Sequence, residues 1–321
     1  MTTLTTRGSG PDRAKLMKNG SVALIMAAAI VVPLLTGSPY VMDVGIQILF
    51  FVTLALGLNV VVGYAGLLDL GYAAYFAVGA YAAGILTQRA GLSFWLALVV
   101  AGAASMILGL LIASTVLRLR SDYLAIVTLG FGEIIRITAN NLDVTGGPSG
   151  IFSIPSPNIF GFQLNQPMHY YYITLILVVV SAVALYRLQE SRIGRAWACI
   201  REDQDAAEAM GIPTLRYRLL AYATGTCWAG LTGAIFAVKM TAVSPMSFSF
   251  MQSITVLLAV VMGGLGSIPG VILGGALVIL IPEALRGVSE WRYLVFGVVL
   301  ILLMIFRPSG LWPARGPAKG E

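Results

Sequence analysis

Long apolar runs, separated by short stretches with charge, proline or glycine, dominate the chain. A helix needs about 20 apolar residues to cross a bilayer, and the chain has such runs near residues 21–37, 43–62, 69–88, 93–117, 123–139, 170–187, 215–239, 251–265, 270–285 and 292–306. Runs 123–139 and 251–265 are short, so they could be tilted, broken or re-entrant. Runs 251–265 and 270–285 could together form one re-entrant hairpin. The pattern predicts an all-α polytopic membrane protein with about 8–10 transmembrane helices, some of them short or re-entrant.

The composition narrows the class of protein further. Hydrophobic residues make up 58% of the chain and charged residues 11%, whereas soluble proteins carry roughly 25% charged residues. A single soluble core has no use for so much apolar surface, which excludes a water-soluble enzyme and a disordered chain. A nucleic-acid-binding domain would need basic residues clustered on a wetted face. The expected surroundings are therefore a lipid bilayer, with no nucleic acid.

Basic residues set the predicted orientation, because Lys and Arg concentrate on the cytoplasmic side. With the N-terminus inside, the cytoplasmic stretches include the basic segments 7–18, 118–120, 187–218 and 307–319, whereas 141–168 has no Lys or Arg. Both termini are thus predicted to be cytoplasmic. The predicted organisation is a cytoplasmic segment 1–20, a single transmembrane domain 21–312 with a cytoplasmic loop 188–214 and an external loop 141–168, and a cytoplasmic tail 313–321.

The loop 187–218 is the longest highly charged stretch, and it mixes basic with acidic side chains. Apolar side chains recur in it at the spacing of a helix that lies at the membrane surface: Ile193, Trp197 and Ile200. A second helical run from Glu202 to Met210 is followed by Gly211 and Pro213, which end helices. A short exposed helix of this kind suits docking into a groove on a partner protein. A solvated loop that only joins two spans explains the same residues, and both interpretations stay open on the pattern alone.

Glycine interrupts the apolar runs in two regions. Candidate positions for a pathway that opens and shuts are Gly63, Gly66, Gly71, Gly263, Gly264 and Gly266. Glycine lets helix backbones approach closely, so tight helix packing accounts for most of these positions. Broken helices that line a transport pathway are the other interpretation.

Ionisable side chains inside the predicted spans are few. Glu133 and Arg136 stand three residues apart on one helical face, where pairing lowers the cost of burying each charge. Asp69 lies near a predicted cytoplasmic helix end and Lys239 near an external one. A proton relay usually needs more carboxylates or histidines along its path. Glu133 and Arg136 are therefore interpreted as a structural or gating pair.

No motif predicts an enzyme. The string Gly147-Pro148-Ser149-Gly150 matches intramembrane serine proteases, but those need a buried nucleophile with a histidine base; here the serine lies in a polar loop, and His169 is the only histidine. The sequence has no G-x-x-x-x-G-K-[ST] loop for ATP and no Cys/His cluster with metal-ligand spacing. Cys199 and Cys227 are interpreted as small structural residues. No cofactor bound by this chain is predicted, so nucleotide energy would come from another polypeptide.

Several strings carry a family resemblance: LNVVVGYAGLLDLGYAAYFAVGAYAAGIL (58–86), LAIVTLGFGEIIRITANNLDVTGGPSGI (124–151), SRIGRAWACIREDQDAAEAMGIP (191–213), VVMGGLGSIPGVILGGALVILIPEALR (260–286) and FRPSGLW (306–312). In this order and at this spacing they resemble the LivM-type permease subunits of branched-chain amino acid ABC importers. The resemblance covers most of residues 41–312, and the first 40 residues match poorly.

The resemblance implies a role for the charged loop. Asp205-Ala206-Ala207 followed by Gly211 is similar to the E-A-A-x-x-x-G element that docks importer permeases on their ATPase, with aspartate in place of glutamate. The implied ATPase-coupling helix comprises Asp205, Ala206, Ala207, Glu208 and Gly211.

The resemblance also implies partners and an activity. The expected function is a permease subunit that translocates branched-chain or related amino acids across the bacterial inner membrane. The implied partners are a homologous LivH-type permease, two ABC ATPase subunits that bind ATP and Mg, and a periplasmic or extracellular solute-binding protein. That binding protein would meet loop 141–168 and the turn 240–250. The alternative is a secondary transporter or channel that works alone, and the exact substrate stays open.

Overall fold

The structure is a computed structural model, and it describes residues 38–117, 121–159, 162–286 and 292–313. The predicted run 21–37, the segment 1–20 and the tail beyond Pro313 lie outside the described residues. The long helices are α2 (Pro39–Asn59), α3 (Tyr72–Gln88), α4 (Phe94–Val116), α5 (Ser121–Asn141), α6 (Pro167–Glu190), α9 (Thr214–Met240), α10 (Phe250–Gly263), α11 (Ile268–Ala284) and α12 (Arg292–Phe306). Two short helices, α7 (Arg192–Glu202) and α8 (Gln204–Ala209), connect α6 to α9.

Short irregular elements join these helices. A π-helical turn, η1 (Val60–Tyr64), extends α2, and two 3₁₀ turns are η2 (Asp143–Thr145) and η3 (Pro245–Phe248). The four strands have two residues each: β1 (Ile151–Phe152), β2 (Asn158–Ile159), β3 (Phe162–Gln163) and β4 (Ala242–Val243). β1 pairs antiparallel with β4, Ile151 opposite Val243, and β2 pairs with β3. The fold is therefore helical, with strands only in the connections of the described segments.

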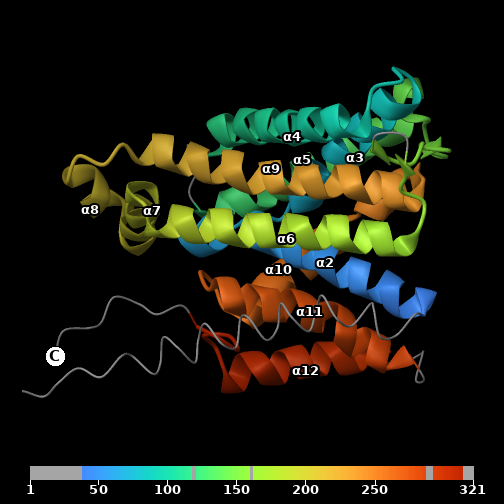
Figure 1. The fold of residues 1–321 in the computed structure, drawn as a ribbon. Helices are drawn as coiled ribbons and strands as arrows, with labels where there is room; N and C mark the ends of the chain where they lie inside the picture. The colour runs from blue at the N-terminus through green and yellow to red at the C-terminus, as the bar shows by residue number, and fades with distance from the viewer. Residues whose placement is uncertain (1–37, 118–120, 160–161, 287–291, 314–321) are drawn as a thin grey trace, which may run out of the picture.

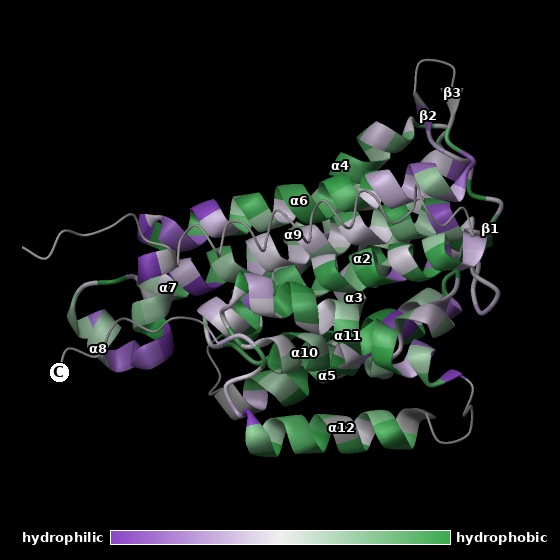
Figure 2. Ribbon diagram, turned by 60° about the horizontal axis from the view of Figure 1, so that its bottom comes forward, coloured by the Kyte–Doolittle hydropathy of each residue, from purple (hydrophilic) through white to green (hydrophobic). Residues whose placement is uncertain are grey.

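The long helices lie side by side along a common direction (Figure 1). Helices α7 and α8 project at one end of this bundle, and the strands gather at the opposite end. Figure 2 shows apolar residues along the helix shafts, with hydrophilic residues concentrated in α7 and near the connections. Four helical stretches in the described residues are long and apolar enough to cross a membrane: Pro39–Tyr64, Phe94–Val116, Pro167–Glu190 and Thr214–Met240. This distribution is the one expected of a bundle surrounded by lipid.

Close backbone contacts hold the centre of the bundle. Helix α9 packs against both α3 and α4. A Cβ atom on Gly233 would lie 2.7 Å from the backbone nitrogen of Ala80, so only glycine permits this approach of α9 to α3. On the neighbouring interface, the Ser105 hydroxyl of α4 donates a hydrogen bond of 2.8 Å to the Tyr75 carbonyl of α3. Small and polar residues at such contacts are typical of helices that associate in membranes.

The predicted runs from 43–62 onward each coincide with a helix, and the all-α prediction is confirmed. The run 69–88 begins too early: residues 66–71 form a non-helical connection, in which Gly66 has a φ of +70°, and α3 starts only at Tyr72. The predicted helix 202–210 is also wrong at its start, since Glu202 is the last residue of α7 and α8 begins at Gln204. The break is at Asp203, whose extended backbone and capping side chain start a new helix.

Helices α10 and α11 form an antiparallel hairpin packed along α2. The turn between them lies at the α7 end, where the Gly266 nitrogen donates to Asn59 Oδ1. At the far end of α11, Glu283 accepts a hydrogen bond from the Tyr40 hydroxyl. Since Tyr40 begins α2 and Asn59 ends it, α11 runs the length of α2. The hairpin therefore does not turn back half-way along the bundle.

Candidate functional site

Helix α7 is anchored to the end of the bundle by its apolar stripe. The Ser191 hydroxyl caps the helix by accepting hydrogen bonds from the Ile193 and Gly194 nitrogens. The predicted stripe is confirmed, because Trp197 is fully buried and Ile200 is 3% exposed, while Ile193 packs against the core. It contacts protein rather than a membrane surface: Trp197 Nε1 donates to the Tyr217 carbonyl at 2.6 Å. This packing fixes α7 rigidly relative to α9.

Helix α8 projects beyond α7 and offers an exposed face (Figure 1). Of the predicted coupling residues only Ala207 is buried, whereas Asp205, Ala206, Glu208 and Gly211 are exposed. Gly211 has a φ of +81°, the left-handed conformation of a helix cap. The prediction that glycine ends this helix is confirmed.

Glu208 holds this segment together from within. Its carboxylate accepts hydrogen bonds from the Thr214 hydroxyl at 2.6 Å and from Gln204 Nε2 at 3.0 Å. These hydrogen bonds favour the ionised carboxylate and lower the pKa of Glu208 below its ordinary value. Asp205 instead lies exposed in the first turn of α8. A negative charge there is favourable because it lies at the positive end of the helix dipole.

A groove opens beside α7 and α8. It has a volume of about 330 Å³ and is lined by Arg192, Arg195, Ala196, Cys199, Gly211, Ile212, Pro213 and Tyr217. Two arginines and several apolar side chains therefore stand between α7 and the segment that follows α8. This combination of charge and apolar surface is suited to a protein partner.

Helix α7 contacts the turn at the end of α2. The Tyr64 ring stacks on Trp197 with centroids 6.3 Å apart, and its hydroxyl bonds to Gln189 Oε1 at 3.3 Å. Arg201 Nη1 donates to the Gly63 carbonyl. A Cβ atom on Gly66 would lie 3.1 Å from Arg201 Cγ. The contact is close because Gly66 has no side chain.

The same turn contacts the hairpin of α10 and α11. Asn59 Oδ1 accepts the Gly266 nitrogen at 2.9 Å, and a Cβ atom on Gly63 would lie 2.6 Å from that nitrogen. We call this contact between α7, residues 59–66 and the turn 264–267 the α7 junction. It brings together the predicted positions Gly63, Gly66 and Gly266, which lie far apart in sequence.

The remaining candidate glycines support close packing nearby. A Cβ atom on Gly263 would lie 2.7 Å from Val271 Cα, and one on Gly264, whose φ is +117°, would lie 2.8 Å from the Trp312 carbonyl oxygen. Gly71 abuts α5, since a Cβ atom on it would meet the Thr128 carbonyl. The interpretation that these glycines serve tight helix packing is consistent with each contact.

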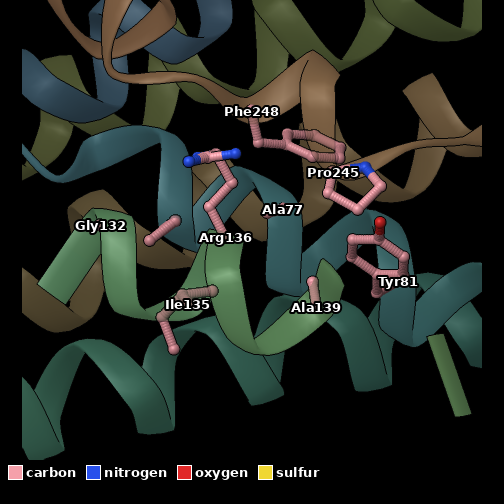
Figure 3. Close-up of a pocket in the computed structure, with 9 residues that line it drawn as sticks. Ala77, Tyr81, Gly132, Ile135, Arg136, Ala139, Pro245 and Phe248 are labelled. Carbon is pink, nitrogen blue, oxygen red and sulfur yellow. The ribbon is translucent and has the colours of Figure 1, made fainter. Parts of the chain in front are cut away.

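Arg136 lies elsewhere, in the lining of a pocket between α3, α5 and η3 (Figure 3), and Glu133 stands beside it on α5. Arg136 Nε bonds to Glu133 Oε2 at 2.8 Å, so the predicted pairing is confirmed. We call this pocket the α5 pocket; it is lined by Ala74, Ala77, Tyr81, Gly132, Ile135, Arg136, Ala139, Pro245 and Phe248. The structure thus separates Gly63, Gly66, Gly264 and Gly266 at the α7 junction from the ion pair of Glu133 and Arg136 at the α5 pocket, whereas Gly71 and Gly263 serve other close contacts.

Two further ionisable residues occupy the positions expected for helix ends. Asp69 is fully buried at the α7 end of α3, where its Oδ1 accepts the Gly71 nitrogen at 2.8 Å. Lys239, at the other end, forms an ion pair of 2.7 Å with Asp43, 196 residues away in sequence. This pairing holds the start of α2 against the end of α9.

The intramembrane protease alternative lacks its geometry. Ser149 is exposed in a turn of loop 141–168 and does not end a buried helix. Cys199 and Cys227 are both free. Within the described ranges no group of three or more His, Cys, Asp and Glu residues stands together as a metal site would.

The sequence analysis did not identify several residues at the α7 junction and in the α5 pocket. Asn59 was a detectable signal, because a carboxamide inside an apolar run must find a hydrogen-bond partner. Tyr81, Pro245 and Phe248 had no such signal, since aromatic and proline residues are common in the chain. Only the fold brings η3 back into contact with α3 and α5.

Comparison with known proteins places this arrangement in context. A family model described as "Branched-chain amino acid transport system / permease component" matches residues 40–304. The high-affinity branched-chain amino acid transport system permease protein LivM of Salmonella typhimurium is 40% identical, across 87% of this chain and 73% of that protein. The probable LivM protein of Methanocaldococcus jannaschii is 23% identical, across 81% of this chain and 90% of its own length.

A second type of permease also matches in part. The LivH protein of Escherichia coli, named as a permease of the same kind of transport system, is 32% identical across 42% of this chain and 46% of its own length. No solved structure matches.

Proposed function

The chain belongs to the family of branched-chain amino acid transport system permease components, and on that premise we propose that it forms half of the membrane pathway of an ATP-driven importer for branched-chain amino acids. The other half would be a homologous permease of the LivH type. Two ATPase subunits would bind ATP and Mg, and an external solute-binding protein would deliver the amino acid. The chain would lie in the bacterial inner membrane with both termini in the cytoplasm.

The exposed first turn of α8 is the observation that carries the proposal. Helix α8 stands at the extreme end of the bundle (Figure 1), and Asp205 in its first turn is exposed. Trp197 and Ser191 hold the neighbouring helix α7 firmly. A rigidly mounted short helix with an exposed face is suited to insertion into a groove on an ATPase subunit.

The α7 junction supplies a route by which such docking would affect the pathway. A displacement of α7 acts on Gly63 through Arg201 and on the end of α2 through the stacked Tyr64 ring. The Asn59 amide then connects that end to Gly266 in the hairpin of α10 and α11. Contiguous backbone contacts of this kind transmit a movement with little loss, because they leave no free space to absorb it.

Reversal of one charge tests the proposal. We expect Asp205→Arg to remove the ATPase subunits from the purified complex and to abolish leucine uptake, while the permease stays folded in the membrane. Glu208 is unsuitable for this test, because its carboxylate bonds to Gln204 and Thr214 and its loss would disturb the loop itself. Asp143→Arg, an equal charge change in the exposed η2 turn at the opposite end, is the matched control for retention of the ATPase subunits. Its uptake is not compared, because loop 141–168 is expected to meet the solute-binding protein.

The outcomes separate the coupled importer from a carrier that works alone. Uptake by Asp205→Arg at the wild-type rate would contradict a coupling role for α8. Leucine accumulation in liposomes that contain only this chain would favour the secondary transporter. Dependence of uptake on ATP and on the copurified subunits would favour the importer.

A further inference from the structure

The α5 pocket combines an apolar wall with one arginine, Arg136, which is paired with Glu133. Its walls come from one face of α3, one face of α5 and the η3 turn, and most of the lining side chains are small or apolar (Figure 3). Pro245 and Phe248 close it from the η3 side, and both are buried. Phe248 is held in place by Phe76, whose ring centroid is 5.2 Å away. A rigid apolar wall of this kind accepts an aliphatic side chain.

Arg136 retains unused hydrogen-bonding capacity in this pocket. Its Nε atom bonds to Glu133, but no hydrogen bond to its two terminal nitrogens is found among the described residues. In Figure 3 the guanidinium rises from α5 toward the segment that carries Phe248. An arginine uses such free N–H groups to bind a carboxylate through two parallel hydrogen bonds.

A second polar group in the pocket also lacks a partner. The Tyr81 side chain is 6% exposed, and its hydroxyl makes no hydrogen bond in the structure. A buried hydroxyl is normally hydrogen-bonded. Its position in the lining of the α5 pocket makes the hydroxyl available to a ligand.

Glu133 and Arg136 lie in the predicted span 123–139, where a charged side chain costs free energy. Side chains of Arg136 and Glu133 remain 28% and 34% exposed, and they lie on a helix whose outer face is otherwise apolar, with Ile134 and Ile137 exposed. Charged groups within a membrane face a protein neighbour or a water-filled cavity rather than lipid. The exposed part of the pair is therefore expected to face the mouth of the pocket rather than lipid.

We propose that the α5 pocket is a transit site for the zwitterionic amino acid, in which Arg136 in the lining binds the α-carboxylate, its ion-pair partner Glu133 beside the pocket binds the α-ammonium group, and the apolar wall holds the branched side chain. The inference rests on the proposed importer function and assigns a substrate-contacting site within this chain. An ion pair of opposite charges on one helical face matches the two opposite charges of the amino acid. Tyr81 adds a hydrogen bond to the bound molecule.

The pocket must open before it binds. In this conformation its walls approach so closely that no water molecule fits between them. Helix α5 packs far less extensively against α3 than α9 does. Movement of α5 away from α3 therefore opens the site, whereas the α3–α9 interface and the aromatic contacts of Phe248 stay fixed.

The experiment uses ligands that lack one of the two charges. Binding of labelled leucine, leucinamide and 4-methylpentanoate is measured on the purified permease–ATPase complex without its binding protein. We expect Arg136→Gln to weaken leucine binding by about 10- to 100-fold and to leave leucinamide, which has no carboxylate, nearly unaffected. Glu133→Gln produces the converse pattern, with 4-methylpentanoate nearly unaffected. Tyr81→Phe weakens leucine binding by about 2- to 10-fold without loss of thermal stability.

Controls separate a binding role from a structural one. Arg89→Gln changes an exposed arginine that bonds only to the Asp143 carbonyl, and it should leave all three affinities unchanged. The double variant with Glu133→Gln and Arg136→Gln removes both charges together. It therefore leaves no unpaired charge that could destabilise α5. An equal loss of affinity for all three ligands in Arg136→Gln, or no loss, overturns the transit site, as does the absence of saturable leucine binding by the wild type. Leucine uptake by the complete wild-type transporter is measured separately, because it tests the importer function and not this site.

Discussion

The α7 junction and the α5 pocket are built in opposite ways. At the junction, backbone atoms and glycines fill the space: Gly63 lies against the Gly266 nitrogen, and Gly66 lies against Arg201. In the pocket, side chains define the surface, and Arg136 and Tyr81 leave hydrogen-bonding groups unused. The junction has little freedom to move internally, and the pocket has chemical groups with no partner.

The difference separates two tasks that a pump must combine. Transmission of force needs contacts that do not deform, which close backbone packing supplies. Recognition of a solute needs polar groups that are free until the solute arrives. The α5 pocket is not at the end that bears α8, so docking and solute contact would occur in different parts of the chain. Changes at the two places should therefore have different effects.

The largest expected effect is loss of the buried indole at the junction. Trp197 is fully buried, stacks on Tyr64 and bonds to the Tyr217 carbonyl. Trp197→Ala should cost about 3–5 kcal/mol of folding free energy and detach α7 from α2. Thermal unfolding in detergent and leucine-stimulated ATP hydrolysis measure the two consequences.

An exposed tryptophan provides the comparison for this variant. Trp95 is 39% exposed and makes one long hydrogen bond of 3.4 Å to the Asn158 carbonyl. Trp95→Ala should cost no more than about 1 kcal/mol and leave stimulation intact. If both variants lost the same stability, α7 would not be fixed by this contact.

Alanine substitutions at two glycines, one at the α7 junction and one in α5, should change the folding free energy by smaller amounts and in opposite directions. A Cβ atom on Gly63 would meet the Gly266 nitrogen at 2.6 Å, whereas one on Gly130 in α5 would meet nothing within 4 Å. Gly63→Ala should destabilise the protein by about 1–3 kcal/mol through overpacking. Gly130→Ala should stabilise it by up to about 1 kcal/mol through helix propensity. Unfolding temperatures of the two variants in one detergent give the answer, and a tolerated Gly63→Ala would show that the junction is looser than its contacts indicate.

The hydrophobic pattern was sufficient to predict the helices from α2 onward, because apolar runs of membrane length have few alternatives to a helix. It failed where backbone geometry overrides composition. Residues 69–71 were assigned to a span, but they belong to the connection 66–71, in which Gly66 has a left-handed backbone, and α3 begins only at Tyr72. The break at Asp203 was missed because a capping side chain within a charged loop resembles any other acidic residue.

The site was predictable only where partners are close in sequence. Glu133 and Arg136 stand one helical turn apart, so their pairing followed from spacing. Contacts between Asn59 and Gly266, or between Phe248 and Phe76, join segments separated by most of the chain. A single sequence does not show which residues far apart in the chain come into contact. That is why the glycines could be named as candidates but not assigned to a junction or a pocket.

The smallest expected effect is the pH dependence of α8. Hydrogen bonds from Thr214 and Gln204 lower the pKa of Glu208 in the folded loop, so the ionised carboxylate stabilises it. That contribution is fully present above the ordinary glutamate pKa of about 4.3 and is lost as the pH falls through the lowered pKa of the folded state. A spin label at Met210, which is 80% exposed, should therefore gain mobility only below about pH 4.3.

Glu208→Gln keeps an acceptor but has no charge to titrate, so its label mobility should not change across this range. A transition that persists in Glu208→Gln would assign the pH dependence to another group. Because the α5 pocket lies far along the bundle from α8, leucine binding should not follow this transition, and a joint change would contradict the separation of the two regions.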